Sequence, residues 1–281
     1  MIAGIDTVSI KTRDSVSDTL PKGAIKTYAY NDIQTFRINP NAYKGYEIYS
    51  LQEYKAVVQE IINLLGLSDF WYSRIDIRLD SYIAEYPEVE KINKLLILLL
   101  YCQNPASNNL YQSIHGMTGE KIDSCYRGST VQVESYDKAR EEPSWMVLSR
   151  LELRSTKLLE RTRADVPAVL ASWERRLGGC LAFYDKAIYQ KTEALKTRYF
   201  AGRAAGVYNS PSDFVQKNID DIYTPQQMDA LLAALGVKNP AQVRYNLKKR
   251  HPDLSLDYIS QKTLAFYISE IQKKISEFSQ K

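Results

Sequence analysis

The segment Tyr72–Asp80 (YSRIDIRLD) decides the fold class of this chain. Side chains alternate between the two faces of a β-strand, so every second residue shares a face. One face of this segment then carries Ile75, Ile77 and Leu79, and the other carries Arg74, Asp76, Arg78 and Asp80. The segment is predicted to be a strand with one apolar face and one face made wholly of ionisable residues.

Two later segments repeat this pattern. In residues 131–138, Val131, Val133 and Ser135 alternate with Gln132, Glu134, Tyr136 and Lys138. In residues 148–154, Leu151 and Leu153 alternate with Arg150, Glu152 and Arg154. Placed side by side, the three strands would gather carboxylates and cations around Tyr136. Alternating charges also suit an ordinary salt-bridged surface sheet, so the pattern leaves a functional and a structural interpretation open.

The rest of the chain separates into a strand-rich part and a helical part. Strands are expected at 5–12, 25–30, 33–38 and 122–126, helices at 50–67 and 88–104, and a loop at 105–119. In the first strand, strict alternation places Ile5, Thr7, Ser9 and Lys11 opposite Asp6, Val8 and Ile10. From about residue 156 only helices are expected. This segregation predicts an α+β fold, with an antiparallel sheet domain over 1–157 and an all-α region over 158–281.

Composition restricts the class of protein and its compartment. The chain has 281 residues, of which 44% are hydrophobic and 25% charged, as in ordinary globular proteins. The apolar run at 95–102 is too short to cross a bilayer, and no signal peptide is visible. Three widely spaced cysteines, Cys102, Cys125 and Cys180, form neither a disulfide framework nor a zinc pattern. We expect a cytoplasmic protein without a membrane partner.

Clustered carboxylates and a tyrosine together suggest a chemistry. Carboxylates that lie close together are costly unless they are paired or bridged by a cation, and oxygen ligands suit Mg²⁺ or Mn²⁺. A tyrosine phenolate can attack a phosphodiester and hold the cut end as a phosphotyrosine. A metal would neutralise the phosphate, and a cation such as Lys138 would favour the phenolate. Only its position beside the acids distinguishes Tyr136 among 21 tyrosines.

Four motifs in order resemble those of a known family. They are Arg74–Asp80 (RIDIRLD), Tyr126–Ser129 (YRGS), Tyr136–Glu141 (YDKARE) and Arg150–Arg154 (RLELR). Together they resemble the core of the rolling-circle replication initiators of Gram-positive plasmids, which some relaxases of conjugative elements share. The upstream Phe36–Asn41 (FRINPN) also resembles a segment of that family, and Ile5–Val8 (IDTV) is similar to the filamentous-phage gene II type of initiator. The resemblance spans about residues 33–157.

The resemblance implies roles for individual residues. It implies that Tyr136 is the nucleophile of a site-specific DNA nicking and strand-transfer reaction, with Lys138 beside it. It implies that Asp76, Asp80 and Glu152 belong to a site for Mg²⁺ or Mn²⁺. Arg74, Arg150 and Arg154 are then expected to contact DNA phosphates. The implied partner is origin DNA, supercoiled or single-stranded, and a host helicase is a further candidate.

Two features depart from the simplest version of this scheme. The chain lacks the His-x-His pair of many other rolling-circle nickases, because its two histidines are His115 and His251. The plasmid family also lacks that pair, and His115 is expected to be an ordinary loop residue. A second Tyr-Asp-Lys begins at Tyr184, in a helical stretch without surrounding acids, so packing is its expected role.

The helical region has its own basic segments. Residues 150–203 carry 12 basic and 6 acidic residues, and residues 238–281 carry 9 and 4. Helices at 224–235 and 240–250 resemble a helix-turn-helix in outline, and the second contains Arg244, Lys248, Lys249 and Arg250. These residues are candidate contacts to origin DNA. Packing or homodimerisation of the helices is the alternative.

The sequence leaves several functions open. An initiator of rolling-circle replication and a relaxase that nicks a transfer origin share the same chemistry. A non-enzymatic origin- or operator-binding protein would use the acidic sheet only as a surface. A metal-dependent nuclease that uses water would leave no covalent adduct. These alternatives differ in whether Tyr136 is needed.

Overall fold

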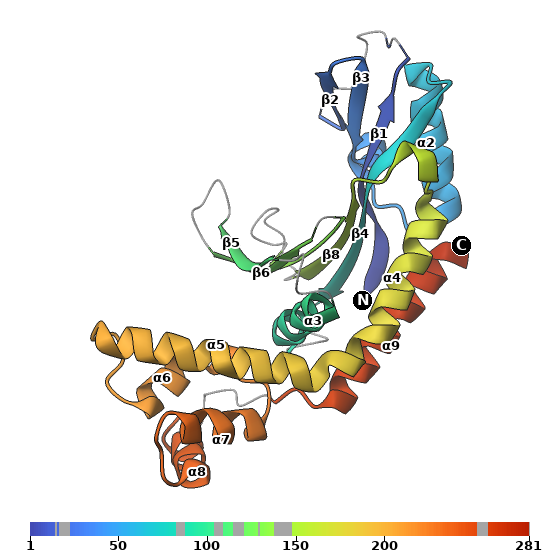
Figure 1. Ribbon diagram of the computed structural model, residues 1–281. Coiled ribbons are helices and arrows are strands. Elements are labelled where there is room, and N and C mark those ends of the chain that lie inside the picture. The colour runs from blue at the N-terminus through green and yellow to red at the C-terminus, as the bar shows by residue number, and fades with distance from the viewer. Residues whose placement is uncertain are drawn as a thin grey trace.

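The computed structural model describes residues 1–14, 16, 23–82, 88–103, 109–114, 121–128, 130–137, 148–251 and 258–280. Within these ranges, eight strands form one antiparallel sheet in the order β2-β3-β1-β4-β8-β7-β6-β5 (Figure 1). The strands are β1 (Ile2–Thr12), β2 (Ile25–Tyr30), β3 (Ile33–Ile38), β4 (Phe70–Tyr82), β5 (Asn109–Ile114), β6 (Lys121–Arg127), β7 (Val131–Asp137) and β8 (Leu148–Thr156). The α+β prediction is confirmed.

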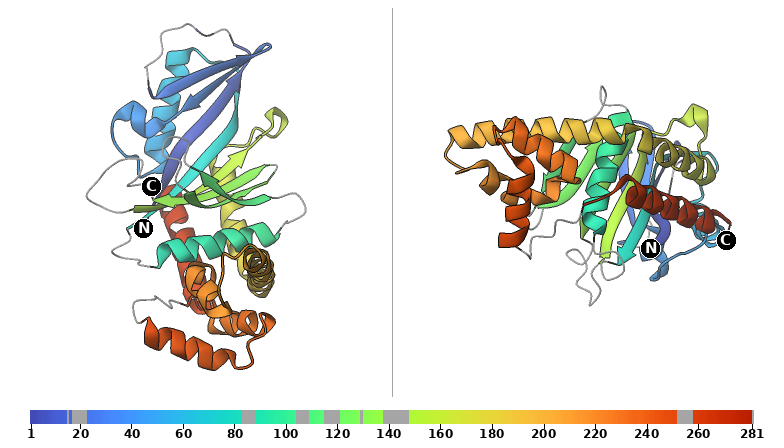
Figure 2. Two further views of the ribbon diagram at one scale, coloured as in Figure 1. Left: turned by 90° about the vertical axis from the view of Figure 1, so that its left-hand side faces the viewer. Right: turned by 90° about the horizontal axis from the view of Figure 1, so that it is seen from below.

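Among the described residues, the first three helices lie between strands along the chain, and the other six follow the last strand. The helices are α1 (Pro40–Lys44), α2 (Leu51–Leu65), α3 (Val89–Gln103), α4 (Val166–Cys180), α5 (Tyr184–Ala204), α6 (Pro211–Lys217), α7 (Pro225–Ala234), α8 (Pro240–Arg250) and α9 (Gln261–Gln280). In Figure 1 the long helices α2, α4 and α9 lie to the right of the sheet, and among the described residues no long helix lies on the opposite side. A second view shows α5 to α8 grouped at one end of the molecule (Figure 2).

Local sequence signals account for most element boundaries. Ser50 caps α2 by accepting a hydrogen bond from the Glu53 amide at 3.2 Å, as its position before the apolar repeat predicts. Gly66 ends that helix in the left-handed conformation at φ 64°, which a residue without a Cβ adopts at no steric cost. The Asn31-Asp32 turn joins the two expected strands β2 and β3 in an antiparallel hairpin.

One strand was not predicted. Residues 105–119 were expected to form a loop, but Asn109–Ile114 forms β5 and pairs with β6 at the sheet edge. Its pairing partner, rather than a local preference, makes this segment extended, because asparagine-rich flanks otherwise favour turns. The expectation of a loop over the whole stretch was therefore wrong.

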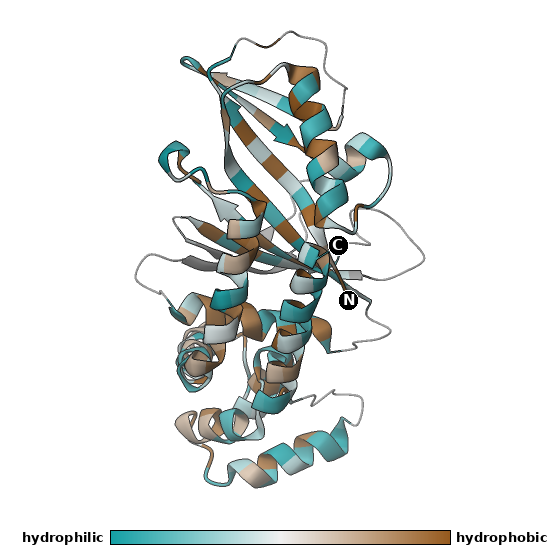
Figure 3. Ribbon diagram, turned by 90° about the vertical axis from the view of Figure 1, so that its right-hand side faces the viewer, coloured by the Kyte–Doolittle hydropathy of each residue, from teal (hydrophilic) through white to brown (hydrophobic). Residues whose placement is uncertain are grey.

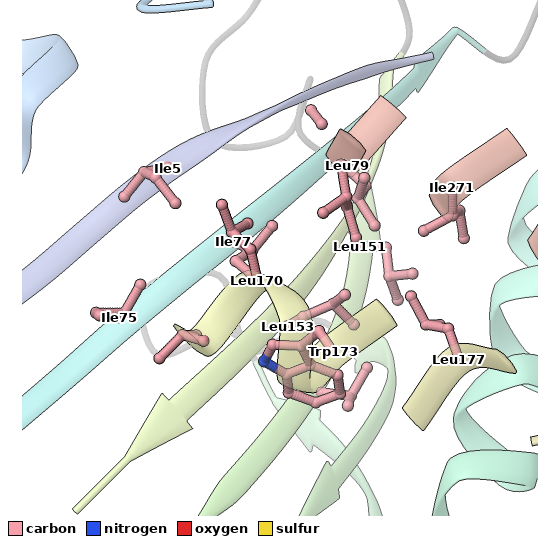
Figure 4. Packing of buried hydrophobic residues seen from close by; sticks show 14 of the residues in the cluster. Ile5, Ile75, Ile77, Leu79, Leu151, Leu153, Leu170, Trp173, Leu177 and Ile271 are labelled. Atoms are coloured by element: carbon pink, nitrogen blue, oxygen red, sulfur yellow. The ribbon is translucent and has the colours of Figure 1, made fainter. Parts of the chain in front are cut away.

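The main hydrophobic core lies between the sheet and the helices. Apolar and polar residues alternate along the strands (Figure 3). Buried apolar residues of the strands and of α2, α3, α4 and α9 belong to one cluster. Ile77 and Leu153 from the sheet pack near Trp173 of α4 and Ile271 of α9 in this core (Figure 4). Residues on both sides of position 157 therefore share one core. The division into domains 1–157 and 158–281 stays a prediction.

A smaller core holds the end of the helical region together. Its members come from the C-terminal half of α5 and from the segments α6, α7 and α8, and include Leu195, Phe214, Leu231 and Leu247. No helix among the described residues is long and apolar enough to span a bilayer.

Candidate active site

The register of three strands builds an ionisable surface on the sheet face that carries no long helix. Across β4 and β8, Asp76 faces Arg154, Arg78 faces Glu152, and Asp80 faces Arg150. Across β8 and β7, Arg150 also faces Tyr136. Directly opposite residues in an antiparallel pair lie on the same face, so the predicted grouping is present. We call Arg74, Asp76, Arg78, Asp80, Glu134, Tyr136, Arg150, Glu152 and Arg154 the polar face.

Most of these side chains are buried, and Arg74, Glu134 and Arg154 are half-buried. Asp76 is 1% exposed, Glu152 3% and Arg150 4%, and Tyr136 is 9% exposed. Buried charges persist only when each has a partner, because the desolvation of an unpaired ion costs several kcal/mol. The register supplies those partners by placing an arginine across from each acid of β4.

Tyr136 is held at the centre of a chain of charged groups. Its hydroxyl donates to Glu152 Oε1. The other oxygen of that carboxylate, Oε2, accepts from Arg154 Nε at 2.8 Å. Arg154 Nη1 in turn lies 2.6 Å from Oε1 of Glu134. The Tyr136 hydroxyl therefore donates a hydrogen bond to a carboxylate that is also held by an arginine.

Arg150 binds two carboxylates from different strands. Its Nε and Nη2 donate to the two oxygens of Asp80 at 2.6 and 2.9 Å. Its Nη1 donates to Asp6 Oδ1 at 3.0 Å. Burial alone would lower the pKa of Arg150, but the hydrogen bond and charge of Asp80 outweigh it and raise that pKa above its usual value. Arg150 is thus a fixed cation beside Tyr136.

Asp6 reaches the polar face through a β-bulge. The pairing of β1 with β4 shifts between Ile5 and Thr7, so that Thr7 rather than Asp6 lies opposite Asp76. An extra residue in one strand re-aims the side chains next to it. The Thr7 hydroxyl donates to Asp6 Oδ2 at 2.9 Å. The strict alternation expected for residues 5–11 was therefore wrong, because Ile5, Val8 and Ile10 all belong to the core.

Asp76 is held by two arginines at the other end of the polar face. Arg74 Nε lies 2.8 and 3.0 Å from its two oxygens, and Arg154 Nε lies 3.8 Å from Oδ2. Burial raises the pKa of Asp76 above its usual value, although the hydrogen bond and charge of Arg74 act in the opposite direction.

A cavity of about 320 Å³ opens beside Tyr136. Its lining residues are Asp6, Thr7, Gly23, Ala24, Lys26, Arg37, Asn39, Ala42, Tyr136, Arg150, Glu152 and Arg154. Four of these side chains are basic and two are acidic, so the cavity favours an anion next to the tyrosine hydroxyl. A second cavity, of about 350 Å³, adjoins it and shares Asp6, Asn39, Ala42 and Arg150.

The carboxylates predicted to bind a metal do not converge in this arrangement. Asp76 and Asp80 are four residues apart on one strand, which separates them by about 13 Å, whereas ligands of one ion lie within ~2–2.6 Å of it. Asp80 and Glu152 also already accept hydrogen bonds from arginines. No three His, Cys, Asp or Glu residues in the described part of the chain could hold a metal together. The residues named for Mg²⁺ or Mn²⁺ thus do not fit a single ion in this geometry, and their role stays a prediction.

The other predicted residues have mixed outcomes. Lys138 and His115 lie outside the described residues. Tyr184 is buried, and its hydroxyl donates to the Ile259 carbonyl at 3.0 Å, which gives the second Tyr-Asp-Lys a packing role. Arg244 forms a two-point ion pair with Asp229 of the preceding helix, at 2.9 and 3.0 Å.

Sequence reasoning missed part of the site. Asp6, Lys26 and Arg37 all line the cavity with Tyr136. The alternation of the hairpin strands could have found Lys26 and Arg37, because they lie directly opposite each other across β2 and β3. Asp6 carried no such signal, since a bulge cannot be recognised from a two-residue repeat.

Comparison with known proteins gives one structural likeness. No family model matches the chain, and no curated protein matches it. A structure described as the rolling circle replication initiator protein from Geobacillus stearothermophilus is similar, with 14% sequence identity and a TM-score of 0.32. The match covers 61% of this chain and 77% of that one. This likeness does not establish family membership.

Proposed function

We propose that this protein nicks DNA at a specific site and holds the cut strand on Tyr136, as an initiator of rolling-circle replication does. The observation that carries the proposal is the hydrogen bond from the Tyr136 hydroxyl to the buried Glu152 carboxylate, at a cavity lined by four basic side chains. The four ordered motifs described above support it independently. The same chemistry would serve a relaxase that nicks a transfer origin.

The side chains of the cavity suit each step of such a reaction. Glu152 accepts the phenolic proton, and the Tyr136 oxygen attacks the phosphorus of a bound phosphodiester. A bond forms between that oxygen and the phosphorus, and the bond to the 3′-oxygen of the leaving nucleotide breaks. The 3′-oxygen takes up a proton from solvent and leaves as a 3′-hydroxyl. Arg150 and Arg154 are fixed by their carboxylate partners and stabilise the negative charge that develops on the phosphoryl oxygens. Resealing reverses these steps, because the phosphotyrosine conserves the energy of the broken phosphodiester bond.

A second surface suits contact with duplex DNA. Lys248, Lys249 and Arg250 are exposed in the last turn of α8, while Arg244 is tied to α7 by Asp229. We propose that the three exposed cations contact phosphates of the origin and that Arg244 mainly fixes the angle between the two helices. This surface also favours the second candidate function, a DNA-binding protein that does not cut.

Covalent capture tests the main proposal and identifies the target sequence in the same experiment. The protein is incubated with Mg²⁺ or Mn²⁺ and an end-labelled pool of single-stranded oligonucleotides that contains a randomised segment. Adducts that survive denaturation are recovered, and the attached DNA is sequenced. We expect one enriched sequence joined through a 5′-phosphotyrosine at position 136.

Two variants and a matched control decide the role of the tyrosine. Tyr136→Phe is expected to abolish the adduct, and Glu152→Gln to lower its rate of formation by about 10²–10⁴-fold, the usual contribution of a general base. Tyr184→Phe alters the other Tyr-Asp-Lys and should leave adduct formation unchanged. An undiminished adduct with Tyr136→Phe would refute the proposal. Cleavage without any adduct would favour a nuclease that uses water, and enrichment of bound DNA without cleavage would favour the non-enzymatic binder.

A further inference from the structure

The edge strand β2 exposes nearly its whole length. Five of its six side chains are exposed, and only Ile25 is buried. Lys26, Tyr28 and Tyr30 alternate along it and therefore share one face. Tyr28 is 54% exposed and Tyr30 is 80% exposed. Large aromatic side chains that stand this far out of an edge strand do not contribute to the core.

This row lies on the same side of the sheet as Tyr136. Lys26 is paired with Arg37 of β3, Arg37 with Ser9 of β1, and Ser9 with Arg74 of the polar face. Residues directly opposite each other point the same way, so the row continues the polar face to the sheet edge. Lys26 and Arg37 also line the cavity that contains Tyr136. The row thus leads from solvent to the tyrosine hydroxyl.

The charges at the inner end of the row are available to a ligand. Neither Lys26 nor Arg37 has an ion-pair partner among the described residues. They differ in this from Arg150 and Arg154, which are held by carboxylates. Two cations that line the cavity and two exposed aromatic rings beyond them thus form one continuous row.

We propose that Lys26, Tyr28, Tyr30 and Arg37 form a track that binds single-stranded DNA and guides it to Tyr136. Bases stack on the two tyrosine rings, and phosphates contact the two cations. Aromatic side chains beside a basic groove bind single strands because every base has a face for stacking, whereas a duplex keeps those faces covered. Alternate residues of a strand lie about 6.6 Å apart, which lets neighbouring bases use successive rings. The route to Tyr136 rests on the proposed nicking function.

Binding of labelled oligonucleotides tests the track. Fluorescence anisotropy measures the affinity of full-length protein carrying Tyr136→Phe for fluorescein-labelled dT12, and for a duplex of equal length. Tyr28→Ala and Tyr30→Ala are each expected to weaken dT12 binding about tenfold, and together about 100-fold, since one stacked base contributes roughly that much. Duplex affinity should stay unchanged. Tyr189→Ala is the matched control, because that tyrosine is 66% exposed on α5.

The possible results separate the track from the nicking proposal. Circular dichroism first confirms that all variants fold, as expected for exposed side chains. If the double variant binds dT12 as tightly as the Tyr189→Ala control, or loses dT12 and duplex equally, the track is refuted. Restoring Tyr136 and measuring adducts adds an independent readout: the double variant should need more DNA for half-maximal rate at an unchanged maximal rate. If the double variant loses dT12 binding, but protein with Tyr136 restored forms no adducts, the track is supported and the nicking proposal is refuted.

Discussion

Replacing Asp80 by alanine tests whether the carboxylates of the polar face hold arginines or a metal. Arg150 is 4% exposed and donates three hydrogen bonds, two to Asp80 and one to Asp6. Asp80→Ala removes two of the three and leaves a buried guanidinium with a single partner. Breaking a buried ion pair in this way costs about 3–5 kcal/mol, and the remaining Asp6 contact places the expected loss near 3 kcal/mol.

Urea unfolding, followed by tryptophan fluorescence, measures that loss. Trp173 is buried in the main core and should report its exposure. The experiment is run first in EDTA and then in Mg²⁺, and we expect the same loss in both. Thermal unfolding under the same conditions should show a midpoint temperature lower by about 6–10 °C. Asp6→Ala removes only one of the three hydrogen bonds that Arg150 donates, together with the bond from the Thr7 hydroxyl. Because this carboxylate is partly exposed, the change should cost about 1–2 kcal/mol.

A different outcome would refute the arginine-partner argument. If Asp80 served chiefly as a metal ligand, its removal in EDTA would be neutral or stabilising, because it would relieve repulsion between carboxylates. The cost would then appear only when Mg²⁺ is present. A loss below about 1 kcal/mol in EDTA is therefore incompatible with a structural pair between Arg150 and Asp80.

Two further predictions concern stability away from the tyrosine. Burial alone would raise the pKa of Asp221, but ion pairs with Lys191 and Arg198 lower it below its usual value. A lowered pKa stabilises the fold above the unfolded-state pKa of about 4, so Asp221→Asn should be less stable than wild type at pH 7 and approach it as the pH falls through 4 to 3 in urea titrations; a constant difference would contradict this. Asn41 is buried, and its side chain donates to the Ile5 carbonyl at 2.9 Å and accepts from a backbone amide at 2.9 Å. Asn41→Ala leaves both groups unsatisfied and should cost about 2–4 kcal/mol in the same assay, whereas a neutral result would show that water replaces the side chain.

Alternation predicted the arrangement of β4, β7 and β8 because each strand is regular and buries one face. A two-residue repeat fixes which side chains share a face. The pairing of the neighbouring strands β7 and β8 then brings Tyr136 beside Glu152. It could not predict the partner of each acid, because that depends on the register between strands. A shift of two residues would have put Asp76 opposite Glu152 or Thr156 instead of Arg154.

Other parts of the site depend on contacts far apart in the sequence. The bulge that turns Asp6 onto the polar face arises from the pairing of β1 with β4, and β5 becomes a strand only by pairing with β6. The metal prediction assumed that acids on one face converge. Positions four apart on a strand share a face but lie about 13 Å from each other. Two acids on one face therefore need not bind the same metal ion.

The packing of α9 on β1 has a consequence for synthesis of the chain. The first strand and the final described helix belong to the same core, and α9 contacts β1 directly. While translation proceeds from β4 to α9, part of the apolar side of the sheet therefore lacks its cover, for roughly 10–40 s at ~5–20 residues per second. During that interval the nascent chain depends on chaperones, or on the earlier helices α2 to α4, to keep this surface from aggregating. A truncation before α9 should consequently yield insoluble protein, even though it leaves every strand intact.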